Sequence, residues 1–316
     1  ISSDQTICMG SAPMAFTSVA ASGDGVKTYQ WQDSTATSGW TNVASGGTGA
    51  TYSAGVLGEN TWFRRIATAT VGGVSCHLAS NILSVTVIDF DPGTIDSDQV
   101  ICEGEIPALL SGTAASDNYP AYGYAYAYQW QSRTATGSYV NIPLATDLDY
   151  TPTEELYEDM YYRRKVTATV AGAQCVLYTN ELHVTVNNFT VGSISAPQTI
   201  CENTAPAPLT YSGTLAGGDG ESYDLVWQYK TVNDLDYIDD PAATADTYDP
   251  GVLTEDTWFR LKVVSNIGVT NSCPKYTNEI KVTVNNFDPG TIGNDQIICA
   301  NTTAATLGSV TAASGD

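Results

Sequence analysis

The strongest constraint on this chain is a short cysteine-containing segment that returns about once in every hundred residues. The pattern Gln-x-Ile-Cys ends at Cys8, Cys102, Cys201 and Cys299, and successive cysteines of this set are 94, 99 and 98 residues apart. Such a period is too long for ankyrin, tetratricopeptide or leucine-rich repeats, and it matches one small domain per repeat. The chain is therefore expected to be a tandem array of similar domains.

The repeat pattern sets the expected domain boundaries. The divisions are repeat 1 (1–88), repeat 2 (89–187), repeat 3 (188–285) and the N-terminal part of a truncated fourth repeat (286–316). About thirty residues are too few to bury a sandwich core. We therefore expect the sequence to be a segment of a longer protein.

Alternation of polar and apolar residues predicts about seven short strands in each repeat, and no helical periodicity is evident. One predicted strand carries the motif Tyr-Gln-Trp-Gln, or Leu-Val-Trp-Gln in repeat 3. We interpret its tryptophans, Trp31, Trp130 and Trp227, as core anchors, because they resemble the strand-C tryptophan of immunoglobulin sandwiches. The predicted fold class is all-β, with tandem immunoglobulin-like Greek-key β-sandwiches arranged as an elongated rod.

Each full repeat holds a second cysteine roughly seventy residues after the first. We therefore predict one disulfide within each repeat, pairing Cys8 with Cys76, Cys102 with Cys175, and Cys201 with Cys273, and leaving Cys299 over. Regular pairing implies an oxidising compartment and thus an extracellular location. Reduced, buried cysteines in a cytosolic protein are the alternative. Zinc is disfavoured because there is no Cys-x-x-Cys pair.

The junctions between repeats are short, and each contains a phenylalanine at a fixed place. Phe90, Phe189 and Phe287 are expected to pack at the interfaces between domains. Such junctions differ from flexible Gly/Ser linkers, and they predict a semi-rigid arrangement.

The longest predicted strand of each repeat places aromatic and cationic residues on its outward face: Trp62, Arg64, Tyr161, Arg163, Trp258 and Arg260. This face would suit sugars, but we favour a cross-strand ladder that covers the sheet and pairs with nearby carboxylates. The same alternation places Arg65 and Arg164 inward, where repeat 3 has Leu261. We expect these two arginines to lie near the sandwich edge and to extend towards solvent.

Four carboxylates crowd the first junction, and their oxygens could bind calcium: Asp89, Asp91, Asp96 and Asp98. The second junction has no carboxylate between Asn187 and Gln198, so a uniform calcium-linker scheme fails. Solvated acidic turns are the interpretation we favour, and no other cofactor is expected.

Charge and motifs exclude several functions. A formal charge of -22 would repel nucleic acid and anionic lipid headgroups. No run of about twenty apolar residues predicts membrane insertion. There is no Gly-x-Ser-x-Gly elbow, His-Glu-x-x-His motif or phosphate-binding glycine loop, so we expect the chain not to be an enzyme.

The repeat also resembles a known family. The motifs Gly-Thr-Ile-x-x-Asp-Gln-x-Ile-Cys, Tyr-Gln-Trp-Gln, Tyr-Tyr-Arg-Arg and Asn-x-Leu-x-Val-Thr-Val resemble repeats of giant surface proteins of Bacteroidota. They are most similar to the gliding-motility adhesin SprB and its relatives, which the type 9 secretion system exports. The resemblance implies a structural and adhesive stalk in a cell-surface filament.

The expected partners are neighbouring repeats, and a substratum or surface polysaccharide bound through regions outside this sequence. Two alternatives remain open: an array of glycan-binding modules, or the stalk of a secreted enzyme whose catalytic domain lies elsewhere.

Overall fold

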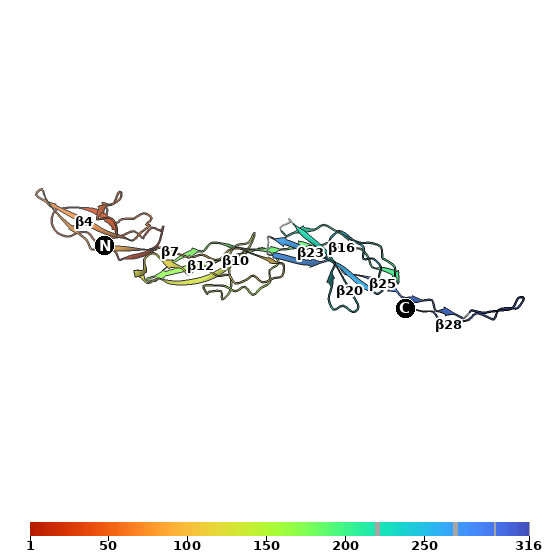
Figure 1. Cartoon of the computed structure of the whole chain (residues 1–316). Helices are drawn as coiled ribbons and strands as arrows, with labels where there is room; N and C mark the ends of the chain where they lie inside the picture. The colour runs from red at the N-terminus through yellow and green to blue at the C-terminus, as the bar shows by residue number, and fades with distance from the viewer. Residues whose placement is uncertain (219–221, 268–270, 294, 316) are drawn as a thin grey trace. The chain divides into compact units, whose positions relative to one another are not determined.

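The computed structural model describes residues 1–218, 222–267, 271–293 and 295–315. Three successive repeats rich in β-strands follow one another along the chain, with β4 in the first, β12 and β10 in the second and β20 and β23 in the third (Figure 1). One short 3-10 helix, η1 (Pro120–Tyr122), is present among these residues. The helices of the described residues include none with the length and apolar character that crossing a membrane requires.

Repeat 1 is built on one large sheet. Its strands are β1 (Gln5–Cys8), β2 (Val26–Thr35), β3 (Thr41–Asn42), β4 (Thr61–Val71), β5 (Val74–Ala79) and β6 (Leu83–Ile88). Their order is β1-β6-β4-β2-β3, with β5 paired to β4. β1 runs parallel to β6, and the other pairs are antiparallel.

Repeats 2 and 3 reproduce this sheet, with the orders β11-β10-β12-β14-β8 and β17-β25-β23-β20-β21. The strands of repeat 2 are β7 (Phe90–Asp91), β8 (Gln99–Cys102), β9 (Ser116–Asp117), β10 (Ala125–Thr134), β11 (Val140–Asn141), β12 (Met160–Val170), β13 (Ala173–Tyr178) and β14 (Leu182–Asn187). The strands of repeat 3 are β15 (Phe189–Thr190), β16 (Ser193–Ile194), β17 (Gln198–Cys201), β18 (Leu209–Ser212), β19 (Ala216–Gly217), β20 (Tyr223–Thr231), β21 (Ile238–Asp239), β22 (Thr247–Tyr248), β23 (Thr257–Ile267), β24 (Asn271–Tyr276) and β25 (Ile280–Asn285).

The second layer of each sandwich is less regular. In repeat 1 it is held by isolated bridges, including one between Phe16 and Tyr52, whereas in repeat 3 it forms the small sheet β16-β18-β22. The rings of Phe16 and Tyr52 pack against Trp31 and Phe63 of the large sheet, with centroids 4.7–6.0 Å apart. The core therefore lies between the two layers, as in an immunoglobulin-like sandwich.

All three tryptophans predicted as core anchors are fully buried. The indole Nε1 of each donates to a backbone carbonyl in the loop that leads to the second layer: Trp31 to Gly49, Trp130 to Asp147 and Trp227 to Ala245. A buried indole N–H needs such an acceptor. The chain is thus all-β, with tandem immunoglobulin-like β-sandwich repeats.

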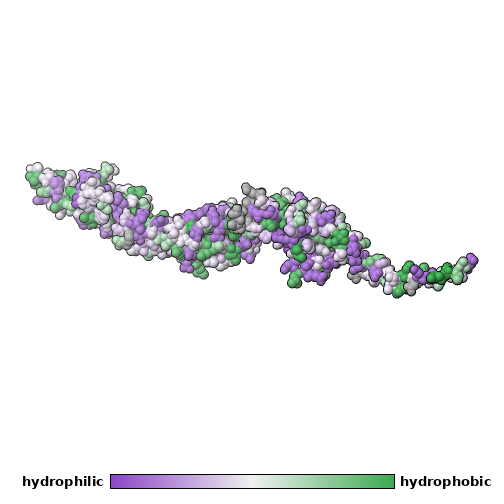
Figure 2. Space-filling model, viewed as in Figure 1, coloured by the Kyte–Doolittle hydropathy of each residue, from purple (hydrophilic) through white to green (hydrophobic). Residues whose placement is uncertain are grey.

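After β25 the chain runs out and back once and forms two nested two-stranded sheets. They consist of β26 (Phe287–Asp288) with β29 (Ser314–Gly315) and β27 (Thr291–Ile292) with β28 (Ser309–Thr311). Figure 2 shows hydrophobic residues on the surface of this C-terminal segment, and Ile292, Leu307 and Val310 are among its exposed side chains. This segment has no large sheet of its own among its described residues.

Candidate functional site: the disulfide-bonded junctions between repeats

The disulfides do not form within repeats. Cys8 of repeat 1 is bonded to Cys175 of repeat 2, and Cys102 of repeat 2 is bonded to Cys273 of repeat 3. The Cα atoms of each pair are 5.5 Å apart, a separation that a disulfide spans. The predicted pairs Cys8–Cys76, Cys102–Cys175 and Cys201–Cys273 are therefore wrong, and Cys76, Cys201 and Cys299 are exposed free thiols.

Strand register explains why a repeat cannot close its own disulfide. In repeat 1, Cys8 lies opposite Ile88 at the end of β6, three positions beyond the Val85–Thr61 pair. Cys76 instead lies opposite Ala69, near the far end of β4. About eleven residue positions separate the two sites along the sheet, or roughly 36 Å at about 3.3 Å per residue. The two cysteines of a repeat thus lie at opposite ends of its sheet.

The first junction is apolar. Ile88, Phe90, Val166 and Ala168 are buried in one cluster around Cys175, with Cys8 packed against it. Because β1 and β6 run parallel, both strands end at the same edge of the sheet. Cys8 and Ile88 therefore present one surface to the hairpin β12–β13. The disulfide and the cluster therefore act on the same interface.

The second junction has the same geometry but a polar composition. Asn187 and Ser265 are fully buried, and the Ser265 hydroxyl donates to Asn187 Oδ1 at 3.1 Å. Lys275 forms an ion pair with Glu103 and donates to the Phe189 carbonyl at 2.6 Å. Two distinct sets of contacts thus accompany the two disulfides.

The phenylalanines of the junctions differ in their surroundings. Phe90 and Phe189 are 5% and 1% exposed. Phe90 lies in a cluster that contains Ile88 of repeat 1 and residues of repeat 2, and Phe189 lies in the core cluster of repeat 3, against which Cys102 of repeat 2 packs. Phe287 is 62% exposed, so the packing predicted for it is absent from this structure. The rod-like arrangement stays a prediction.

Arg164 supports the first junction from inside repeat 2, and the expectation that it extends to solvent is wrong. It is fully buried and donates to the carbonyls of Leu148 at 2.7 Å, Pro92 at 3.2 Å and Thr113. Burial lowers the pKa of its guanidinium from the ordinary value. Arg65 is similarly buried in repeat 1, where it donates to Ser18 and to the Val19 carbonyl.

We expect Arg164→Leu to lower the free energy of unfolding of repeat 2 by about 3 kcal/mol, although leucine is the residue that repeat 3 has at this position. Three carbonyl oxygens in partly buried hydrogen bonds would lose their donor. Urea unfolding measures the loss, and Arg163→Leu on the half-buried outward face is the matched control, with an expected loss below about 1 kcal/mol. Equal losses in the two variants would contradict this role.

The outward arginines are engaged by residues of their own repeats. Arg163 lies between the rings of Tyr139 and Tyr178, at 3.8 and 3.9 Å, and its Nε donates to Gln131 at 2.9 Å. The other residues predicted for a sugar-binding face have comparable neighbours: Arg64 stacks on Trp40, Arg260 on Tyr237 and Tyr276, Tyr161 on His183, and Trp258 lies under Lys281, while Trp62 is opposite Ser84. Two rings thus stack on each of the guanidinium groups of Arg163 and Arg260, and one ring stacks on that of Arg64.

The four aspartates proposed for calcium are not brought together. Each accepts a separate hydrogen bond: Asp89 from Asn118, Asp91 from the Gly93 amide, Asp96 from Ser111 and Asp98 from the His183 amide. Among the residues that the structure describes, no group of three histidine, cysteine or acidic side chains has a metal-binding arrangement.

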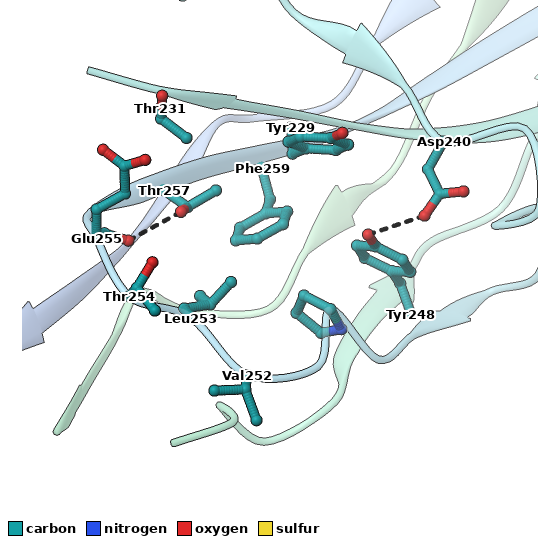
Figure 3. A pocket seen from close by; sticks show the side chains of 11 residues that line it. Tyr229, Thr231, Asp240, Tyr248, Val252, Leu253, Thr254, Glu255, Thr257 and Phe259 are labelled. Carbon is teal, nitrogen blue, oxygen red and sulfur yellow. Dashed lines mark hydrogen bonds between the residues drawn. The ribbon is translucent and has the colours of Figure 1, made fainter. Parts of the chain in front are cut away.

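Repeat 3 also has a pocket of about 320 Å³ beside β20 (Figure 3). Asp240 accepts a hydrogen bond from the Tyr248 hydroxyl at 3.0 Å, and burial together with this bond raises the pKa of Tyr248. At the equivalent positions, repeats 1 and 2 have Val43 and Ile142, whose amides also donate to the core tryptophan carbonyl. This carboxylate is therefore specific to repeat 3 and does not account for what the repeats share.

The fold and the junctions together define a class: immunoglobulin-like β-sandwiches in tandem, with each disulfide joining one repeat to the next. The chain belongs to the family described as Domain of unknown function (DUF8696), which matches residues 1–89, 91–188 and 190–286. No curated protein matches it in sequence.

Several solved structures give weak superpositions. Sidekick-1 immunoglobulin domains 1–4 show 11% identity and a TM-score of 0.27 over 91% of this chain and 73% of that one. Drosophila N-cadherin EC1–4 shows 12% identity and a TM-score of 0.26 over 99% and 83%. Domains A168–A170 of titin show 12% identity and a TM-score of 0.30 over 86% of this chain and 99% of that one. Superpositions at this level support no inference about function.

Proposed function

We propose that this chain is a non-catalytic, extracellular spacer that transmits force through covalently coupled repeats, as part of a cell-surface adhesin. One observation carries the proposal: each of the two disulfides crosses a junction between repeats. At such a junction the backbone and the disulfide are two covalent connections in parallel. Force that opens one connection is still borne by the other.

The cellular setting follows from the chemistry and from the family resemblance. Regular disulfides persist in oxidising compartments, which supports a location outside the cytosol. The similarity of the repeat motifs to gliding-motility adhesins of Bacteroidota supports a filament exported by the type 9 secretion system. A glycan-binding array is less well supported, because Arg163 and Arg260 are each stacked on two aromatic rings of their own repeats.

A backbone cut at a junction tests the proposal. A protease site inserted at the exposed Ser97 lies near the start of repeat 2, inside the loop closed by Cys8 and Cys175 and before Cys102. With the chain tethered by its ends between a surface and a bead, cleavage there should leave the bead attached. Addition of a reductant should then release it.

The matched control places the same protease site at Pro289, after Cys273 and outside both disulfide loops. Cleavage at Pro289 should release the bead without reductant. Release of the bead by cleavage at Ser97 alone would refute the proposed parallel connection.

A further inference from the structure

The two junctions use different residues at equivalent positions. At each junction, the last residue of the large sheet of one repeat packs near the residue that pairs with the disulfide cysteine of the next repeat. These residues are Ile88 and Ala168 in the first junction, and Asn187 and Ser265 in the second. A second pair of positions also differs between the junctions: the residue directly after Cys8 or Cys102, and the residue two positions after Cys175 or Cys273. They are Met9 and Leu177 in the first junction but Glu103 and Lys275, an ion pair, in the second. One junction type is apolar and the other is polar.

The free thiols Cys76 and Cys201 lie on surfaces that are equivalent to the two sides of a junction but that carry no disulfide. Cys76 is opposite Ala69 on β4–β5, as Cys175 is opposite Ala168 on β12–β13. Val71 is 57% exposed, whereas its counterpart Val170 is 4% exposed within the first junction. The acceptor surface of repeat 1, made of Ala69, Val71, Cys76 and Leu78, is thus uncovered.

The other uncovered surface is at the end of repeat 3. Cys201 lies opposite Asn285 on β17 and β25, as Cys8 lies opposite Ile88. Asn285 is exposed, whereas its counterparts Ile88 and Asn187 are 1% and 0% exposed. The donor surface of repeat 3, made of Cys201, Glu202 and Asn285, carries the residue types of the polar junction.

We propose that Cys201 forms a disulfide with a further repeat of this family that has serine and lysine at the positions of Ser265 and Lys275. Asn285 then takes the hydroxyl, and Glu202 takes the ammonium group. The acceptor surface around Cys76 has alanine and leucine at these positions, and it fits a repeat of the apolar type. The residues beside each cysteine thus select which repeats are joined. This inference rests on the covalent coupling proposed above.

The bond forms by thiol–disulfide exchange with a small-molecule disulfide. The Cys201 thiolate attacks oxidised glutathione and releases one glutathione thiol, and the partner cysteine then displaces the second glutathione. Two protein thiols are oxidised and one glutathione disulfide is reduced to two thiols. The docked surfaces raise the local concentration of the partner cysteine, which favours the matched pair.

A second copy of the chain serves as the probe. A donor chain carries Cys76→Ser and Cys299→Ser, and so retains Cys201. An acceptor chain carries Cys201→Ser and Cys299→Ser, and so retains Cys76. The two are mixed in glutathione redox buffer, and the Cys201–Cys76 peptide is quantified by mass spectrometry. A second acceptor also carries Ala69→Ser and Leu78→Lys, which convert its surface to the polar type.

The polar acceptor is expected to give at least about tenfold more Cys201–Cys76 disulfide than the unchanged acceptor, because a buried amide or carboxylate without a partner is costly. Asn285→Ala with Glu202→Ala in the donor should abolish the difference. Equal yields from both acceptors, or no crosslink at all, would overturn the inference. In the same digest the Cys8–Cys175 and Cys102–Cys273 peptides report separately on the proposed function.

Discussion

Pulled by its ends until every repeat has unfolded, the oxidised chain is expected to reach roughly 43 nm, and the reduced chain roughly 110 nm, at about 3.5 Å per residue. With both disulfides closed, the shortest covalent path crosses from Cys8 to Cys175, runs back to Cys102 and crosses to Cys273. This path uses about two-fifths of the residues. Single-molecule extension with and without reductant measures the difference.

The variant Cys76→Ser separates this pairing from closure within repeats. Because Cys76 is a free thiol, its replacement should leave the oxidised extension unchanged. A Cys8–Cys76 bond would instead exclude residues 8–76 from the path, and loss of that bond would lengthen the unfolded chain by roughly 24 nm. An increase of that size would count against coupling between repeats.

The second large effect is expected in the core of repeat 3. Trp227→Ala should lower the free energy of unfolding of this repeat by about 4 kcal/mol, through a cavity and lost contacts. Trp227 is fully buried, its ring stacks on Tyr248 at 5.4 Å, and its Nε1 donates to the Ala245 carbonyl at 2.8 Å. Urea unfolding followed by circular dichroism measures the loss.

Leu235→Ala in the same repeat is the control, because this side chain is 98% exposed. Its effect should stay within about 0.5 kcal/mol. A loss below about 1 kcal/mol for Trp227→Ala would mean that the indole does not anchor the core.

The disulfides should add stability as well as limit extension. They close loops with sequence separations of 167 and 171 residues. In the chain-entropy model a loop of this size, closed in the unfolded state, corresponds to about 5 kcal/mol. The two loops overlap, so their contributions are not independent. Repeat 2 is thereby tied to both of its neighbours.

Much of the fold could be predicted because strands and repeats leave local signals. The tryptophan motif recurs at one place in each repeat, and period-two alternation fixes which side of its strand faces the core. The residues of the large sheet, including the long strand that begins near Thr61, follow the same rule. Sandwich repeats could therefore be inferred without any knowledge of pairing.

The disulfide connectivity could not be inferred from that pattern. Recurrence shows that each full repeat has two cysteines, but it does not show at which end of the sheet each one lies. The needed signal was the Gly72-Gly73 turn just before Cys76, which places that cysteine near the tip of a hairpin. Because Cys8 lies near the junction, the register of β4, β5 and β6 rules out the nearer partner in sequence.

The buried arginines were missed for a different reason. Alternation correctly placed Arg65 and Arg164 inward, but a charged side chain was expected to reach solvent. In the structure, backbone carbonyls of the surrounding loops accept their N–H groups. Those carbonyls come from distant parts of the sequence, so no local pattern identifies them.

Mass spectrometry of the natively oxidised protein, digested without reduction, tests the central claim most directly. Coupled repeats predict one crosslinked peptide pair containing Cys8 with Cys175 and another containing Cys102 with Cys273. Free thiols should be found at Cys76 and Cys201 before any partner is added. Peptide pairs joining Cys8 to Cys76, or Cys102 to Cys175, would contradict the account.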